Sequence, residues 1–250
     1  MQKLMAANWK MFKTRADAAR TAREMRATLA GRDDRGVIIF APFTAIAQVA
    51  NALEGAPHMA TGGQNVYPAA EGAFTGEISP QMLRDAGAAW VLVGHSERRH
   101  IMGESLEFIA RKTGFALEQG LKVMLCVGET LAEREAGSLE AVLAQQLHTA
   151  LDGLPKPLPE GSLAVAYEPV WAIGTGKVAG PEEIIAAHAL VRRLVGACLG
   201  EDVGARVPLL YGGSVKAENA AGIIGLDNVD GVLVGGASLQ ADTFARIATA

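Results

Sequence analysis

The most constraining feature of this chain is a repeated alternation of short, mostly apolar segments with longer segments of helical spacing. The alternation runs through all 250 residues. Because the apolar segments carry few polar positions, they indicate strands buried on both faces, as in a parallel sheet with crossover helices. The predicted strands are Leu4–Ala7, Val37–Phe40, His58–Gly62, Trp90–Val93, Val123–Val127, Leu163–Tyr167, Val207–Tyr211 and Gly231–Val234.

Helix start and stop signals separate these strands. Ser79 and Pro80 suit the N-cap and first position of a helix, Pro181 opens another, and Thr44 is expected to cap a helix that ends at Leu53. The other predicted helices are Thr14–Leu29, Ser105–Glu118, Leu139–Leu151, Pro181–Leu199 and Ser238–Ile247.

Eight strand–helix units in a chain of this length predict an α/β protein, a closed (β/α)₈ barrel that forms a single domain over residues 1–250. The structural alternative is an open, doubly wound sheet. That fold usually carries a Gly-x-Gly-x-x-Gly turn after its first strand, and this chain has Asn8-Trp9-Lys10 there instead.

Composition narrows the function classes. Half of the residues are hydrophobic and the formal net charge is −4, so no overall positive field would attract nucleic acid or an anionic membrane. We expect no signal peptide and no membrane span. The two cysteines, Cys126 and Cys198, have no metal-ligand spacing, and we expect buried free thiols in a cytoplasmic protein.

Polar residues collect where the predicted strands end, and in a barrel of this kind those ends form one mouth that carries the chemistry. Asn8 and Lys10 follow the first strand, His95 the fourth and Glu168 the sixth. Taken alone, Lys10 could be a solvated surface charge and His95 a structural histidine. If both lie on one rim, Lys10 can supply a fixed positive charge and His95 a hydrogen-bond donor to a substrate. A helical turn opening at Ser96-Glu97 would keep the His95 ring neutral.

Glu168 ends an apolar strand and precedes Pro169. A carboxylate in such a partly desolvated mouth gains basicity, as a general base requires, although a structural ion pair is the alternative. The following segment has a stiff apolar part between two hinges, which favours a lid over an ordinary surface loop. This predicted lid is Pro169-Val170-Trp171-Ala172-Ile173-Gly174-Thr175-Gly176-Lys177.

Two glycine pairs follow the last two strands, Gly212-Gly213 with Ser214 and Gly235-Gly236. Each pair alone could be a tight turn. On the adjacent strands seven and eight they are typical of a barrel phosphate site, where backbone N–H groups approach phosphate oxygens. A helix start near Ala237-Ser238 would add its dipole.

Motifs along nearly the whole chain resemble the triosephosphate isomerase family. In order they are Asn8-Trp9-Lys10-Met11, Gly72-Ala73-Phe74-Thr75-Gly76-Glu77, Gly94-His95-Ser96-Glu97-Arg98-Arg99, Cys126-Val127-Gly128-Glu129, Ala166 to Lys177, Tyr211-Gly212-Gly213-Ser214, Asp230-Gly231 and Val234 to Leu239.

The resemblance implies a reaction and a role for each matching residue. Dihydroxyacetone phosphate and D-glyceraldehyde 3-phosphate would interconvert through an enediolate, without metal or organic cofactor. Glu168 would abstract the proton, His95 would polarise the carbonyl, and Lys10 would supply positive charge. The resemblance assigns binding of substrate or its phosphate to Asn8, Lys10, Gly174, Ser214, Gly235 and Gly236, and supporting positions to Ser96, Glu97 and Cys126.

The family is typically a homodimer, in which the loop after the third strand reaches the partner's site. Here that loop is 64–77, with Phe74 and Thr75 at its tip. Two alternatives remain: another phosphosugar barrel such as an epimerase, and a barrel kept for binding alone. Other phosphosugar barrels lack the Asn-x-Lys, His-Ser-Glu and Glu-Pro-Val-Trp motifs that this chain carries. A barrel kept for binding alone is not supported, because every predicted catalytic side chain is present.

Overall fold

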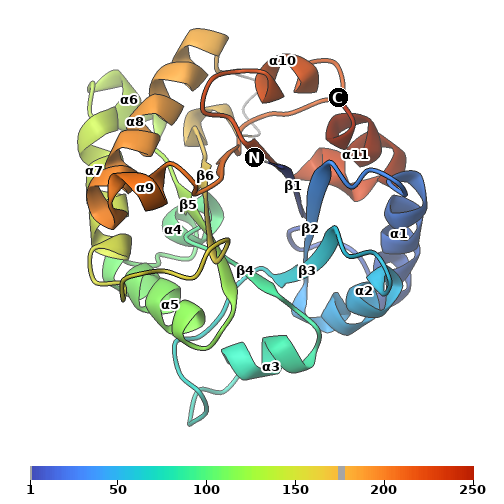
Figure 1. Cartoon of the computed structure of the whole chain (residues 1–250). Helices are drawn as coiled ribbons and strands as arrows, with labels where there is room; N and C mark the ends of the chain where they lie inside the picture. Colours follow the sequence, from blue (N-terminus) through green and yellow to red (C-terminus); the bar gives the residue numbers. More distant parts are fainter. Residues whose placement is uncertain (1, 174–177) are drawn as a thin grey trace.

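The computed structural model describes residues 2–173 and 178–250. Parallel strands close into a barrel in chain order, from β1 next to β2 round to β8 next to β1 (Figure 1). The strands are β1 (Lys3–Asn8), β2 (Arg35–Ala41), β3 (Met59–Gly63), β4 (Trp90–Val93), β5 (Lys122–Val127), β6 (Leu163–Tyr167), β7 (Leu209–Tyr211) and β8 (Gly231–Val234). The predicted fold class is confirmed.

Helices surround the barrel on its outside (Figure 1). They are α1 (Arg15–Thr28), α2 (Ile46–Leu53), α3 (Pro80–Asp85), α4 (Ser96–His100), α5 (Leu106–Glu118), α6 (Leu131–Glu135), α7 (Leu139–Leu151), α8 (Pro181–Leu199), α9 (Glu201–Gly204), α10 (Ala220–Ile224) and α11 (Ala241–Ala248). Short 3₁₀ turns lie at η1 (Phe43–Ala45), η2 (Val170–Ala172) and η3 (Gly236–Leu239).

Two of the predicted helix starts are wrong. Thr44 caps no helix, because it lies inside the η1 turn and α2 begins only after Ala45. The predicted final helix is broken at Gln240, whose backbone is extended, so that η3 precedes it and α11 follows it. By contrast, the Ser79 and Ser105 side chains accept from the backbone N–H of Met82 and Phe108, as N-caps do.

Side chains alternate between two cores along each strand. In β2, Ile38 and Phe40 belong to a core built from strand residues only, which fills the inside of the barrel. Val37 and Ile39 belong to a larger core shared with the helices, outside the barrel. Since both strand faces are covered, the period-2 pattern of a half-exposed sheet is absent, and the strands appear as solid apolar runs in the sequence.

The barrel presents its two ends differently. Loops after the strands carry the polar residues described below, at the carboxyl end. At the opposite end, the segments after α7 and α8 lead into β6 and β7. Among the described residues, no helix has the length and apolar character needed to cross a membrane.

Candidate active site

A cavity of about 290 Å³ lies at the carboxyl end of the barrel. The side chains and glycines that line it come from loops far apart in the sequence. Eight of the predicted site residues share this lining: Asn8, Lys10, His95, Glu168, Ile173, Ser214, Gly235 and Gly236. The structure therefore brings them together, and their chemical roles remain predictions.

Glu168 is a buried carboxylate with two partners. Its Oε2 accepts a hydrogen bond from the backbone N–H of Ser96 at 2.8 Å, and its Oε1 lies 3.1 Å from Nε2 of His95. The residue is only 2% exposed. The start of α4 and the His95 ring therefore hold the two carboxylate oxygens in place.

His95 is the N-cap of α4. Its Nδ1 accepts the backbone N–H of Glu97 at 3.3 Å, whereas the nearer carboxylate oxygen of Glu97 is 3.6 Å away. A nitrogen that accepts an N–H carries no proton itself, so the ring proton sits on Nε2 and points to Glu168. The neutral charge state of the ring stays a prediction.

Lys10 is held in place from both its ends. Its Nζ forms an ion pair with Glu97 Oε1 at 2.6 Å. Its backbone lies in the left-handed region, with φ of 50°, and is tied down by two hydrogen bonds: the Lys10 N–H donates to Asn8 Oδ1, and Gln64 Nε2 donates to the Lys10 carbonyl. A non-glycine residue in this region costs free energy, which surrounding contacts must offset.

Gln64 is one residue whose role the sequence did not reveal. Besides Lys10, its Nε2 donates to the Phe40 carbonyl at 3.0 Å, so it joins the ends of β1 and β2 under the site. Its place directly after a predicted strand was visible, but its partners are distant along the chain. Only the closed barrel brings them within reach.

Gly212 allows the site to be compact. A Cβ atom there would lie 2.9 Å from Cγ of Glu168 and 3.2 Å from the carbonyl of Tyr167. By contrast, a Cβ at Gly236 would meet open space, and Gly236 lines the cavity. The two glycines therefore leave room for different things: Gly212 for the Glu168 side chain, and Gly236 for whatever occupies the cavity.

The first part of the predicted lid is anchored to the barrel. Trp171 Nε1 donates to Oε1 of the buried Glu129 at 2.8 Å, and the Ser214 hydroxyl donates to the Ala172 carbonyl at 2.9 Å. Val170, Trp171 and Ile173 are all half-buried against the barrel.

The remaining lid residues, Gly174, Thr175, Gly176 and Lys177, lie outside the described part of the chain. The prediction that Gly174 contacts phosphate stays a prediction.

Glu129 is a second residue that sequence reasoning named without a role. Its Oε1 also accepts from the Tyr167 hydroxyl at 3.1 Å and lies 3.3 Å from Arg134 Nη1. The carboxylate thus joins the end of β6, the start of the predicted lid and α6. A buried carboxylate needs such partners to stay charged, and its long-range contacts could not be read from local sequence.

Cys126 is buried beneath the site, in the core inside the barrel. Burial raises the pKa of its thiol well above the ordinary value, and the negative charge of Glu168 raises it further. The thiol therefore remains protonated, which suits a packing role and not that of a nucleophile. Cys198 is also a buried free thiol, as predicted.

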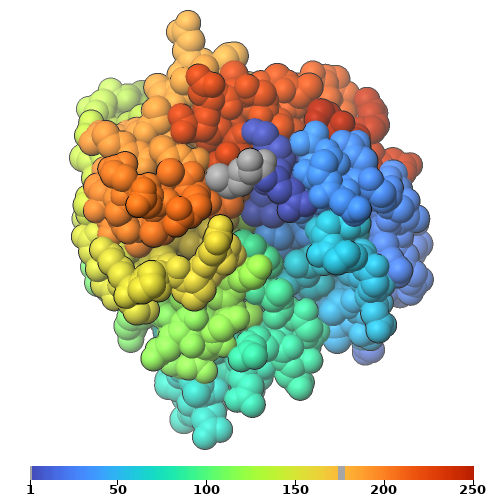
Figure 2. Space-filling model, in the orientation of Figure 1, coloured from blue at the N-terminus to red at the C-terminus, as the bar shows by residue number. Residues whose placement is uncertain are grey.

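The predicted dimer loop projects from the barrel beside α3, at the bottom of Figures 1 and 2. Phe74 packs on Tyr67, with ring centroids 4.4 Å apart, yet remains 42% exposed. Thr75 is exposed at the tip. Neither residue lines the cavity of its own chain.

A family model described as triosephosphate isomerase matches residues 3–250. The chain belongs to this family. It is 63% identical over 249 residues to triosephosphate isomerase of Nitratidesulfovibrio vulgaris strain Miyazaki F, with 99% of both chains covered. It is 49% identical to the protein of that name from Lawsonia intracellularis, covering 99% of this chain and 97% of the relative.

A solved structure agrees with the sequence relatives. The crystal structure of triosephosphate isomerase from Bartonella henselae superimposes with a TM-score of 0.88 at 35% identity, covering 99% of this chain and 98% of that one. The chain is an intramolecular oxidoreductase of the aldose–ketose isomerase type, and it interconverts dihydroxyacetone phosphate and D-glyceraldehyde 3-phosphate, a step of glycolysis and gluconeogenesis. The alternatives of an epimerase and of a barrel kept for binding are thereby set aside.

Proposed function

We propose that Glu168, His95 and Lys10 carry out the isomerisation through an enediolate. Glu168 removes the proton from the carbon next to the carbonyl, and that proton is returned to the neighbouring carbon. Neutral His95 donates its Nε2 proton to the carbonyl oxygen and moves protons between the two oxygens of the intermediate. The observation that carries this proposal is the 3.1 Å approach of His95 Nε2 to Glu168 Oε1 at the cavity that Lys10 also lines.

The rate contributions expected of these groups agree in magnitude with the proposed roles. A positioned acid–base pair contributes about 10²–10⁴-fold to a rate. Preorganised donors and charges at the developing oxyanion add several kcal/mol, roughly 3 kcal/mol for one donor. Lys10 suits this second task because Asn8, Gln64 and Glu97 hold it in one position before substrate arrives. No step requires a metal or an organic cofactor, since only protons move.

Ser214, Gly235 and Gly236 are proposed to hold the phosphate, together with Gly174. The two glycines and the serine follow β7 and β8 and line the cavity, where backbone N–H groups can approach an anion closely. The segment from Pro169 to Lys177 is proposed to close over the bound substrate. Its fixed start, at the Trp171–Glu129 hydrogen bond, supports a hinge at that point.

A homodimer is proposed as the working form, in which Thr75 reaches the partner's site near its Asn8, Lys10 and His95. Large apolar side chains support this. They are strongly exposed on the loops after β1 and β4, on α3 and on the projecting loop: Met11, Phe12, Phe74, Met82, Ile101 and Met102. A second copy of the chain would cover them, since patches of this kind mark association surfaces. We further propose that residues 1–250 are one domain and that the enzyme is cytoplasmic, which two free cysteines support.

A coupled assay tests the proposed chemistry. Purified enzyme is supplied with D-glyceraldehyde 3-phosphate, and dihydroxyacetone phosphate is followed with and without a chelator. We expect chelator-insensitive turnover close to the diffusional ceiling of about 10⁸–10⁹ M⁻¹s⁻¹, for which triosephosphate isomerase itself is a standard example. Turnover that disappears with the chelator and returns with metal would contradict cofactor-free proton transfer.

A further inference from the structure

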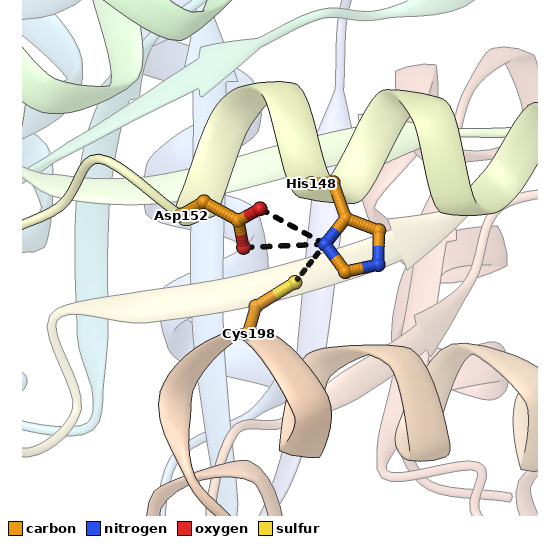
Figure 3. Close-up of side chains that lie close together, drawn as sticks. All are labelled: His148, Asp152 and Cys198. Atoms are coloured by element: carbon orange, nitrogen blue, oxygen red, sulfur yellow. Dashed lines mark hydrogen bonds and ion pairs between the residues drawn. The ribbon is translucent and has the colours of Figure 1, made fainter.

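Three side chains that can bind metal meet on the outside of the barrel, away from the active site. His148 and Asp152 lie one turn apart at the end of α7, and Cys198 lies near the end of α8 (Figure 3). Their ligand atoms all lie within 4.8 Å of one another. His148 Nδ1 is 3.0 Å from Asp152 Oδ2 and 3.5 Å from Cys198 Sγ.

The arrangement differs from a nucleophilic Cys–His–Asp triad. In a triad the nucleophile and the carboxylate contact opposite nitrogens of the imidazole, so that the ring can pass a proton between them. Here Asp152 and Cys198 both approach Nδ1, as Figure 3 shows. Burial and the nearby Asp152 carboxylate together raise the pKa of the Cys198 thiol to about 12, which also disfavours a nucleophile.

Convergence of three ligand atoms on one point is what a metal ion requires. In a tetrahedral zinc site, with bonds of about 2.0 Å to nitrogen or oxygen and about 2.3 Å to sulfur, nitrogen and oxygen lie about 3.3 Å apart and nitrogen and sulfur about 3.5 Å apart. The observed separations of 3.0 and 3.5 Å approach these edges. Two of the three edges of the site thus have the size that zinc requires, and the third, between Asp152 and Cys198, is within 4.8 Å.

We propose that His148, Asp152 and Cys198 form a binding site for a divalent transition-metal ion, best suited to Zn²⁺, with water as the fourth ligand. Thiolate, imidazole and carboxylate together are a donor set that zinc accepts, while Mg²⁺ and Ca²⁺ prefer oxygen alone. The thiolate and the carboxylate would balance the charge of the ion. His148 and Asp152 are exposed, which leaves a path from solvent and room for the water.

Binding of the ion has a simple balance of bonds and protons. The Cys198 S–H bond breaks, its proton passes to solvent, and a sulfur–metal bond forms; a coordinating thiol is deprotonated by the ion. Nδ1 of His148 binds through its lone pair, so its proton moves to Nε2 or is absent. Lys156, whose Nζ donates to the Cys198 carbonyl at 2.6 Å, places a positive charge nearby that favours the thiolate and opposes the ion.

The position of the proposed metal site indicates a structural role. The ends of α7 and α8 lead into the amino ends of β6 and β7, which lie at the end of the barrel opposite the catalytic mouth. In barrels of this class that end serves stability. An ion there would join two neighbouring helices and stabilise the folded chain by mass action, without entering the isomerisation.

Metal titration of the intact, tag-free enzyme tests the proposal. Isothermal titration with Zn²⁺ should give one ion per chain, and Co²⁺ should produce a thiolate-to-metal charge-transfer absorption. Cys198→Ser should abolish that absorption and weaken Zn²⁺ binding at least tenfold, although Cys126 is still present. His148→Ala and Asp152→Asn, both at exposed positions, should each weaken binding as well.

Controls make the result unambiguous. Asp85→Asn removes an exposed carboxylate at the end of α3 and should leave binding unchanged. Saturating Zn²⁺ should raise the melting temperature of the wild type and of Asp85→Asn but not that of Cys198→Ser, with unchanged isomerase turnover. Absence of binding at 100 μM free Zn²⁺, on the order of weak adventitious sites, or equal affinity of wild type and Cys198→Ser, would overturn the proposal.

Discussion

His95 Nε2 lies 3.1 Å from Glu168 Oε1, although the two residues follow strands β4 and β6 with β5 between them. The donor of the pair is Nε2, because Nδ1 already accepts the Glu97 N–H. A substrate carbonyl oxygen entering here would accept the Nε2–H hydrogen bond in place of Glu168. The released carboxylate oxygen would then face the carbon that loses its proton, so the same two groups that bond to each other without substrate become electrophile and base with it.

Gly212 and Gly236 provide a test that separates the base from the phosphate site. Gly212→Ala places a methyl group 2.9 Å from Cγ of Glu168 and must displace it. Because a misplacement of about 1 Å can cost about 10²-fold, we expect kcat to fall about that much with little change in KM. Gly236→Ala projects into the cavity and should instead raise KM. Steady-state kinetics measure both effects.

Gly222→Ala is the matched control for these two variants. Gly222 lies in α10, and a Cβ there meets nothing within 4 Å. It should behave as wild type. A Gly212→Ala enzyme with unchanged kcat would show that the close packing around Glu168 does not position it.

Lys10→Met removes the fixed positive charge of the site. We expect kcat/KM to fall at least about 10²-fold, with both constants affected, since the ammonium would contact substrate before and during the reaction. Lys122→Met, at the amino end of β5, is the control for loss of a lysine far from the mouth. If kinetics of Lys10→Met equalled those of the control, Lys10 would be a surface charge paired with Glu97.

His188 should make stability depend on pH. It is fully buried, and its pKa is lowered from 6.5 to about 4; burial is the largest cause, the Asn228 carbonyl and Asp230 act in the opposite direction, and Arg192 adds to the lowering. Between these values the unfolded chain binds a proton that the folded chain does not. The contribution of the neutral His188 ring to the free energy of unfolding is therefore fully present above pH 6.5. It is lost as the pH drops toward 4, by about 3 kcal/mol in total.

Urea denaturation at fixed protein concentration, repeated from pH 7.5 to about 4.5, measures this slope. His188→Gln should flatten it, whereas His100→Gln, at an exposed position on α4, should leave it unchanged. Equal slopes in wild type and His188→Gln would mean that other groups cause the pH dependence.

The dimer can be measured directly. Light scattering at micromolar concentration should give twice the chain mass of 26.1 kDa. Thr75→Arg, which places a long charged side chain at the loop tip, should shift the mass toward one chain and reduce activity together. A wild type with the mass of one chain and full turnover would refute the proposed dimer.

Much of the fold was visible in the sequence because both faces of its strands are buried. Trp90–Val93, Leu163–Tyr167 and Gly231–Val234 were predicted to the residue, since each apolar run ends at a glycine or a charged residue. The Thr44 prediction failed because a hydroxyl residue two positions after a proline fits a 3₁₀ turn as well as a helix cap, and only packing decides between them.

The candidate site was likewise predictable only in part. Residues at strand ends were predictable, because barrel closure brings every such end to one mouth. The supports could not be predicted: Gln64 finds its partners in β2 and after β1, and Glu129 binds side chains about forty positions away. The His148–Cys198 approach is similar, as these residues lie 50 positions apart and meet only where two helices pack.

The most direct test of the central claim is the kinetic comparison of wild type with Glu168→Asp, using Glu140→Asp on the exposed face of α7 as the control. The shorter side chain withdraws the carboxylate by about an ångström while preserving its charge. Proton abstraction by Glu168 predicts that kcat falls about 10²-fold or more while KM stays near the wild-type value. A Glu168→Asp enzyme whose kcat lies within about twofold of wild type would contradict the assignment of Glu168 as the base.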